Sequence, residues 1–217
     1  MNRAPLATDE YYHIYNRGVD KRQVFSNKDE VERFLLCMQV FNSTDPVLSL
    51  RASLESGGVA TLTPQKKLVE FLCYCLNPNH YHFILKQLVD GGIAEFMKRL
   101  NGGYTWYFNK KHNRNGALFQ GVYKSCHISD NEKLLEMSVY VNINNRVHQI
   151  SGETAVLVRS SWDEYVNGAC GFCEKGVILG QYANPMEYKK FALDTLPTFL
   201  ERKREEKDLA ASMLEDF

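Results

Sequence analysis

The sequence lacks any long apolar run. None of its segments approaches the roughly 20 apolar residues that a membrane-spanning helix needs, and its first residues do not form a secretory leader. Its six cysteines are therefore expected to be reduced thiols in a cytoplasmic protein, because a disulfide framework forms mainly in secreted chains. These absences argue against a membrane protein and against a disulfide scaffold.

The chain also has no net charge, since 26 Lys and Arg balance 26 Asp and Glu. The charges are unevenly distributed, however. Residues 1–150 carry 18 basic against 14 acidic side chains, and residues 151–217 carry 8 against 12. We expect a basic working domain over 1–150 and, over 151–217, a C-terminal extension that packs partly on the core and ends in a charged helix.

A long stretch without acidic residues interrupts this balance, because no Asp or Glu occurs from Phe96 through Ser129. The basic residues of this stretch are Lys98, Arg99, Lys110, Lys111, Arg114 and Lys124, and Tyr104 and Tyr123 are among its aromatic residues. Cations can neutralise phosphates, and aromatic rings beside them can stack on unpaired bases. The pattern favours nucleic-acid contact over the alternative of a solvated helix face with its aromatic residues in the core.

Two histidines one residue apart, His80 and His82, begin an apolar run that reads as a strand. Side chains alternate faces along a strand, so both imidazoles point to the same side and can hold one metal ion. By itself this spacing also fits two ordinary half-buried histidines. His13, a single histidine in an aromatic strand, is more readily explained as a core or surface residue than as a ligand.

A third ligand and a nucleophile are expected on the predicted helix from about 131 to 145. Tyr140 and Asn144 are four residues apart there and share one helical face. If that face meets the histidine strand, Tyr140 presents a phenol oxygen and Asn144 an amide oxygen. A helical tyrosine taken alone is more often a packing residue.

The order of the predicted elements is strand, helix, strand, strand, helix, strand, helix. They cover residues 11–15, 28–41, 68–76, 80–85, 93–107, 117–127 and 131–145, with an exposed excursion over 42–64. Tightly joined neighbouring strands are most simply antiparallel. The pattern predicts an α+β ferredoxin-like sandwich with a central antiparallel sheet, helices on one or both faces, and a C-terminal helical extension.

Four stretches, in the same order, resemble the motifs of the REP-associated tyrosine transposases, members of the HUH superfamily of single-strand DNA nucleases. They are residues 12–18, 76–82, 99–105 and 118–125, and the likeness extends over about residues 11 to 165. An ordered set of motifs is far more specific than any one of them. The resemblance implies the ferredoxin-like fold, with Tyr140 in the place of the family's single catalytic tyrosine and His80, His82 and Asn144 as metal ligands.

The resemblance further implies an enzyme that cleaves and rejoins single-stranded DNA, often at palindromic hairpins, through a 5′-phosphotyrosine and with Mg²⁺ or Mn²⁺. Spacing alone leaves zinc open, because imidazole suits borderline ions better than Mg²⁺. Arg17, in the loop after the first strand, and Gln120, in the fourth motif, join the basic and aromatic residues above as expected DNA contacts. Whether the protein acts as a monomer or a homodimer stays open.

This sequence departs from the family in two places and leaves two alternatives. Asn144 is followed by Asn145 where the family commonly has Pro, and Val122 stands where an Arg is frequent. The first alternative is a non-catalytic nucleic-acid-binding regulator with the same fold. The second is a zinc hydrolase in which water, rather than Tyr140, attacks. A structural zinc site built on Cys170 and Cys173 is disfavoured relative to free thiols.

Overall fold

A five-stranded antiparallel sheet forms the centre of the molecule in a computed structural model that describes residues 6–47 and 66–215. The spatial order of its strands is β4-β1-β3-β2-β5. Their bounds are β1 Tyr11–Arg17, β2 Val69–Asn77, β3 His80–Gln87, β4 Lys124–Ile128 and β5 Arg159–Ser160. The histidine strand β3 is therefore the central strand of the sheet.

The hairpin between β2 and β3 is closed by the two residues Pro78 and Asn79. On its other side β3 pairs with β1 in an antiparallel register that sets Arg17 opposite His80 and Tyr15 opposite His82. Residues directly opposite each other in an antiparallel pair point to the same face of the sheet. The pairing therefore places all four of these side chains on one face.

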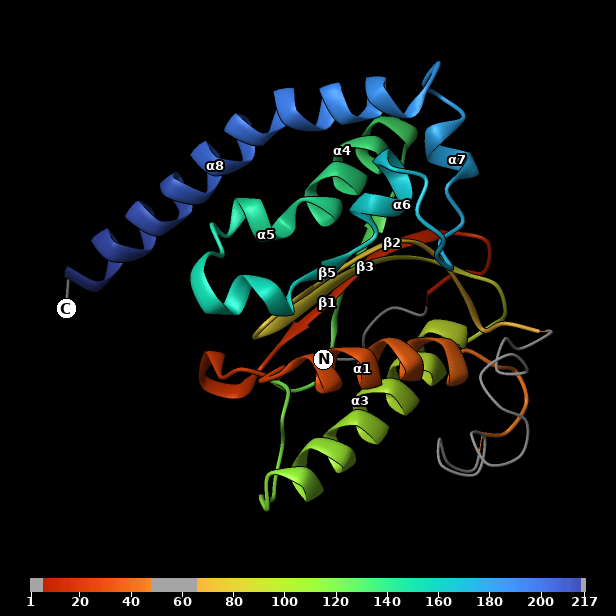
Figure 1. Ribbon diagram of the computed structural model, residues 1–217, viewed down its shortest axis with the longest axis vertical. Coiled ribbons are helices and arrows are strands. Elements are labelled where there is room, and N and C mark those ends of the chain that lie inside the picture. Colours follow the sequence, from red (N-terminus) through yellow and green to blue (C-terminus); the bar gives the residue numbers. More distant parts are fainter. Residues whose placement is uncertain (1–5, 48–65, 216–217) are drawn as a thin grey trace.

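Helices cover both faces of the sheet (Figure 1). On one face lie α1 Lys28–Val40 and α3 Gly92–Lys111. On the other face lie α4 Asn131–Asn142, α5 Asn144–Val147, α6 Trp162–Val166, α7 Gly176–Leu179 and α8 Pro185–Glu215. Two short 3-10 helices, Val19–Lys21 and Gly152–Leu157, lie in the connections.

Each face of the sheet has its own buried cluster, as the alternation along β3 requires. Tyr81 and Phe83 belong to the larger cluster, which packs against α1 and α3. Ile84 belongs to the second cluster, which packs against α4 and α8. The face that carries His80 and His82 is thus the face covered by α4, α5 and α8.

The structure confirms the predicted α+β fold with a central antiparallel sheet and a C-terminal helical region. The strand expected over 117–127 is shorter and covers only Lys124–Ile128. Gly121 lies before it with φ of +68°, and Phe119 makes only an isolated bridge to Gly18, so 117–123 runs as a loop. Most of the excursion expected over 42–64 lies outside the described residues.

The helix expected over 131–145 is divided at Ile143 into α4 and α5. The charged helix expected at the end of the C-terminal extension is part of the long helix α8. Strand β5, which sequence periodicity did not predict, adds Arg159 and Ser160 to the edge of β2. It is two residues long, so no alternation could have revealed it.

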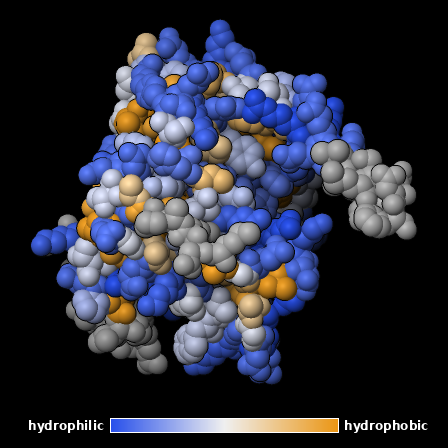
Figure 2. All heavy atoms as spheres, turned by 180° about the vertical axis from the view of Figure 1, so that it is seen from behind, coloured by the Kyte–Doolittle hydropathy of each residue, from blue (hydrophilic) through white to orange (hydrophobic). Residues whose placement is uncertain are grey.

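The face of the molecule seen from behind is largely polar. Figure 2 shows the face behind that of Figure 1, on which hydrophobic side chains form small separate groups among hydrophilic ones. None of the helices within residues 6–47 and 66–215 has both the length and the apolar character needed to cross a membrane.

The adjacent glycines of α3 provide a test of how closely its neighbours pack. A Cβ at Gly103 would lie 2.6 Å from the Phe41 ring, whereas a Cβ at Gly102 would meet nothing within 4 Å. We expect Gly103→Ala to lower the free energy of unfolding by about 1–3 kcal/mol through overpacking. Gly102→Ala should raise it by about 1 kcal/mol, because alanine is the better helix former. Chemical denaturation of the two variants checks both signs, and equal effects would contradict the packing described here.

Candidate active site

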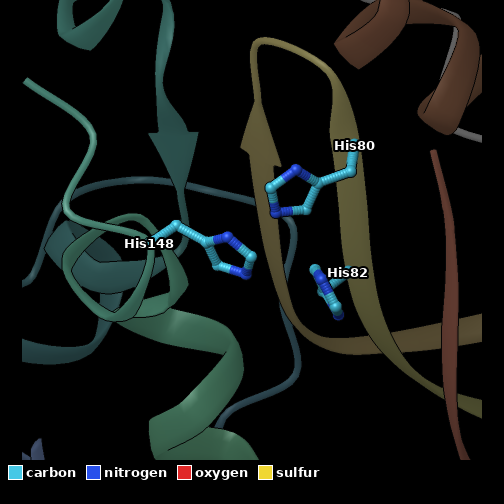
Figure 3. Close-up of side chains that lie close together, drawn as sticks. All are labelled: His80, His82 and His148. Carbon is cyan, nitrogen blue, oxygen red and sulfur yellow. The ribbon is translucent and has the colours of Figure 1, made fainter. Parts of the chain in front are cut away.

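Three histidines meet above the central strand. His80 and His82 come from β3, and His148 comes from the end of α5 (Figure 3). One ring nitrogen of each lies within 4.8 Å of a ring nitrogen of the other two, and the rings of His80 and His148 have centroids 4.4 Å apart. Within the described parts of the chain, this is the one group of three His, Cys, Asp or Glu side chains that could hold a metal ion.

Hydrogen bonds orient the ring of His80. Its Nδ1 donates to Asn79 Oδ1 at 2.6 Å, because an amide oxygen can only accept, and this leaves the lone pair on Nε2. Asn77 Nδ2 donates both to that nitrogen at 2.9 Å and to Asn144 Oδ1 at 2.7 Å. Two acceptors, His80 Nε2 and Asn144 Oδ1, therefore face one shared donor and lie 3.1 Å apart.

This acceptor pair fits a divalent cation that takes the place of the Asn77 N–H donor. Neighbouring ligand atoms of an octahedral ion with bonds of about 2.1 Å lie about 3.0 Å apart, close to the observed separation. Asn144 Nδ2 is buried without a hydrogen-bond partner among the described residues, and as an N–H donor it would be satisfied by an acceptor atom of a bound ligand rather than by the cation itself. The donor set for such an ion would be His80, His82, His148 and Asn144.

Burial keeps the imidazoles neutral. It lowers the pKa of His80 to about 4 and that of His148 to about 3, and the positive charge of Lys203 contributes to both shifts. The pKa of His82 is lowered well below its usual range, again mainly by burial and further by the surrounding histidines. A histidine binds metal through its neutral form, so the site holds its rings ready for a cation at neutral pH.

His13 supports the site from β1. Its Nε2 lies 2.8 Å from His82 Nδ1, and the two rings stack with centroids 5.1 Å apart. The Tyr15 ring stacks beside both imidazoles, with its centroid 5.5 Å from that of His82 and 4.9 Å from that of His13. Sequence reasoning placed His13 in the core or at the surface, and the structure places it in contact with a ring of the candidate site. The signal that could have revealed it is the alternation of His13, Tyr15 and Arg17 along one strand face.

Tyr140 approaches the histidines from α4. Its ring meets the His82 ring edge-on with centroids 5.6 Å apart, and Phe199 of α8 packs against it at 5.4 Å. Burial raises the pKa of Tyr140, and the Asn144 side chain partly offsets this shift. The phenol is therefore protonated at neutral pH and must lose its proton before or during any attack.

An open cleft of about 550 Å³ connects these groups to the surface. Among its lining residues are His80, His82, His148, Tyr140, Arg17, Lys21, Gln120, Lys124 and, from α8, Glu206. Arg17 Nε donates to Gln120 Oε1 at 3.3 Å, and Lys124 Nζ lies 5.9 Å from the centre of the Tyr15 ring. The cleft thus brings together the predicted nucleophile, both strand histidines and three of the predicted DNA contacts.

The other predicted DNA contacts lie elsewhere, on or after α3, across the sheet from the cleft. Tyr104 is fully buried and its hydroxyl donates to Val24 O at 2.6 Å, which corrects its assignment as a surface contact. Tyr123 is also largely buried. Their rings fill the core that α3 shares with the sheet.

The basic residues of the α3 region differ in the hydrogen bonds and ion pairs that they already make within the protein. Arg99 donates to Glu95 Oε1 at 2.8 Å and to Ser43 O at 2.7 Å. Lys111 pairs with the buried Glu30 at 3.1 Å. Arg114 donates to Asn109 and Ala117. Lys98 and Lys110 are exposed.

The chain is similar to one protein family and to several solved structures. A family model described as "Transposase IS200 like" matches residues 7–144. A solved structure described as a REP-associated tyrosine transposase bound to a REP hairpin is similar at 12% identity and a TM-score of 0.46, over 80% of this chain and 89% of that one. The tRNA(His) guanylyltransferase of Saccharomyces cerevisiae is similar at 10% identity and a TM-score of 0.34, over 88% of this chain and 74% of that one. No match was found among curated proteins.

The histidine cluster predicts metal binding that depends on β3. We expect His80→Ala to abolish measurable Mn²⁺ binding in calorimetric titration, because it removes one of the candidate metal ligands, the ring nitrogen that lies next to Asn144 Oδ1. His127→Ala is the matched control, since His127 is an exposed histidine on β4 that contacts Glu10. Equal Mn²⁺ binding by the two variants would show that the cluster is not the site.

The contact between His13 and His82 predicts a smaller effect. His13→Phe keeps a ring of similar size but removes the nitrogen beside His82 Nδ1, so the His82 ring loses its orienting partner. We expect Mn²⁺ affinity to fall about 10- to 100-fold, the usual cost of losing such a partner, with the fold unchanged by circular dichroism. His127→Phe should leave the affinity unaltered.

Proposed function

The chain belongs to the IS200-like transposase family, and from that premise we propose that it cleaves and rejoins single-stranded DNA through a covalent bond to Tyr140. The observation that carries this proposal is the edge-on contact between Tyr140 and His82 in a cleft that also holds His80, whose Nε2 lies 3.1 Å from Asn144 Oδ1. A nucleophile beside a cation site is the arrangement that phosphoryl transfer requires. We further propose a palindromic hairpin as substrate, on the strength of the four ordered motifs.

In the proposed reaction Tyr140 Oη attacks the scissile phosphorus. The bond from phosphorus to the 3′-oxygen breaks, and the phenol proton passes to that oxygen, which leaves a 5′-phosphotyrosine and a free 3′-hydroxyl. The bond between the DNA and the tyrosine preserves the phosphodiester energy. A 3′-hydroxyl can therefore attack the phosphotyrosine and release Tyr140 without ATP.

The residues that would hold the cofactor are His80, His82, His148 and Asn144, and we propose Mg²⁺ or Mn²⁺. A bound divalent ion polarises the scissile phosphate and offsets charge that develops on it. The imidazoles favour Mn²⁺ over Mg²⁺, because nitrogen ligands suit the softer ion.

The protein's own cations would position the strand in the cleft. Arg17 and Lys124 line it together with Gln120, and their charges can neutralise the phosphates that flank the scissile one. Arg17 is fixed by its hydrogen bond to Gln120, so it is already oriented toward the cleft. Neutralising these phosphates lowers the repulsion that the attacking phenol oxygen meets.

A covalent adduct is the decisive test of this chemistry. End-labelled single-stranded oligonucleotides, including hairpins from the DNA flanking its own gene, are incubated with the protein and Mn²⁺ and resolved on a denaturing gel. We expect a labelled protein band that disappears with chelator and in Tyr140→Phe, which keeps the ring but removes the attacking oxygen. Tyr182→Phe is the matched control, because Tyr182 lies outside the cleft and packs against Tyr188.

Other outcomes assign other functions. Cleavage that persists in Tyr140→Phe, with no protein adduct, would identify a hydrolase in which water attacks. Binding without cleavage or adduct, across a broad panel of hairpins, would identify a nucleic-acid-binding regulator that has kept the fold.

A further inference from the structure

Helix α3 carries a row of exposed residues at every fourth position. We call Lys98, Gly102, Trp106 and Lys110 the α3 ridge, since a spacing of four places them along one side of a helix. The ridge lies on the face of the sheet opposite Tyr140, because α3 packs with the cluster of Tyr81 and α4 with the other cluster (Figure 1). It therefore does not belong to the cleft.

Trp106 is the unusual member of the ridge. It is 64% exposed, although tryptophan is one of the most apolar side chains and is usually highly buried. Lys110 Nζ lies 5.1 Å from the centre of its ring. An exposed flat ring with a cation beside it is the combination that stacks on an unpaired base and binds its phosphate.

No contact among the described residues explains why position 102 is a glycine. Apart from proline, glycine is the least favourable residue in a helix interior, yet a Cβ at Gly102 would meet no atom within 4 Å. At neighbouring Gly103 the Phe41 ring excludes any side chain. The missing side chain at Gly102 leaves the helix backbone bare between Lys98 and Trp106, as close approach by a ligand backbone requires.

The charge of the ridge selects the kind of partner. No acidic residue occurs from Phe96 through Ser129, and Glu95, just before this stretch, is paired with Lys98 at 3.5 Å and with Arg99 at 2.8 Å. Two copies of this basic ridge would repel each other. A polyanion is attracted to it.

A hollow lies beside the first residue of the ridge, Lys98. Its volume is about 610 Å³, and it lies between α3, which contributes Met97 and Lys98, and the loop that contributes Val122. Val122 is 75% exposed. Gln120 of the same loop lines the cleft, so this loop has the cleft on one side and the hollow on the other.

We propose that the α3 ridge is a second docking surface for single-stranded DNA, reached from the cleft over the loop at residues 120–123. Trp106 stacks on an unpaired base, Gly102 admits the sugar-phosphate backbone, and Lys98 and Lys110 neutralise phosphates. The proposal rests on the proposed function in one respect, since it takes the substrate to be DNA. According to this proposal, a single DNA strand contacts both faces of the β-sheet.

The two tryptophans of the chain allow a direct test. Trp162 lies on the other face of the sheet, where the Arg146 guanidinium lies over its ring. In the Trp162→Phe protein, Trp106 is therefore the remaining tryptophan. This protein is titrated with a hairpin oligonucleotide that carries long single-stranded flanks, and binding is followed by anisotropy of a dye on the DNA and by tryptophan fluorescence. We expect Trp106 fluorescence to be quenched along the anisotropy curve.

Variants on the ridge give the second measurement. We expect Trp106→Ala to weaken binding of the flanked hairpin about tenfold, the usual effect of losing one stacked base. Gly102→Ala should weaken binding while it raises the melting temperature of the free protein, so its loss of affinity cannot reflect unfolding. Lys98→Gln and Lys110→Gln should each reduce the slope of log affinity against log salt by about 1, whereas Lys190→Gln, an exposed control on α8, should not.

The failures of the two proposals are distinguishable. Anisotropy that shows no binding to any oligonucleotide would contradict the proposed function. Binding without quenching of Trp106, and with unchanged affinity in Trp106→Ala, would overturn the ridge alone. A dimer that forms without DNA and is lost in Trp106→Ala would show that a second copy of the chain, rather than DNA, covers the ridge.

Discussion

The register between β1 and β3 is the constraint on which the candidate site depends. It sets Arg17 opposite His80 and Tyr15 opposite His82, so a cation and an aromatic ring stand beside the two strand histidines. Side chains alternate along a strand, and a slip of one residue would turn every one of them to the other face. The fully buried Tyr81 and Phe83 resist such a slip, because it would move both rings out of the larger core. The same alternation therefore holds the core together and orders the site.

Burying several imidazoles together has a chemical consequence. Each of them is kept neutral mainly by loss of water, and His80 further lowers the pKa of both His82 and His148. A cluster that resists protonation retains its lone pairs for a cation well below neutral pH. Lys203 reinforces this from α8, since its charge disfavours a second positive charge on His80 and His148. The protein thus lowers the pKa of these histidines at the place where a metal ion would supply the positive charge.

The sequence was most informative where a regular period determines which way side chains point. The shared face of His80 and His82 follows from the strand period, and the spacing of Tyr140 and Asn144 follows from the helical one. His148 could not be found in this way, because the break at Ile143 and the turn into α5 determine where it lies. Long-range pairings were equally inaccessible, such as the two-residue strand β5 at the edge of β2. Composition could not tell which members of the stretch over 96–129 face the solvent, since the same aromatic residues suit a core and a binding surface.

Helix α8 shows that the site is not contained within the segment that matches the family model. That match ends at residue 144, yet Phe199 packs on Tyr140, Lys203 Nζ donates to Val147 O at 3.2 Å, and Glu206 lines the cleft. The ring of Tyr140 therefore lies between a histidine of the sheet and an aromatic ring of the C-terminal region. Its burial, which raises its pKa, is partly set by residues far beyond the strand and helix that carry the candidate site. The environment of this tyrosine accordingly depends on how α8 packs, even though no side chain of α8 belongs to the group of candidate metal ligands.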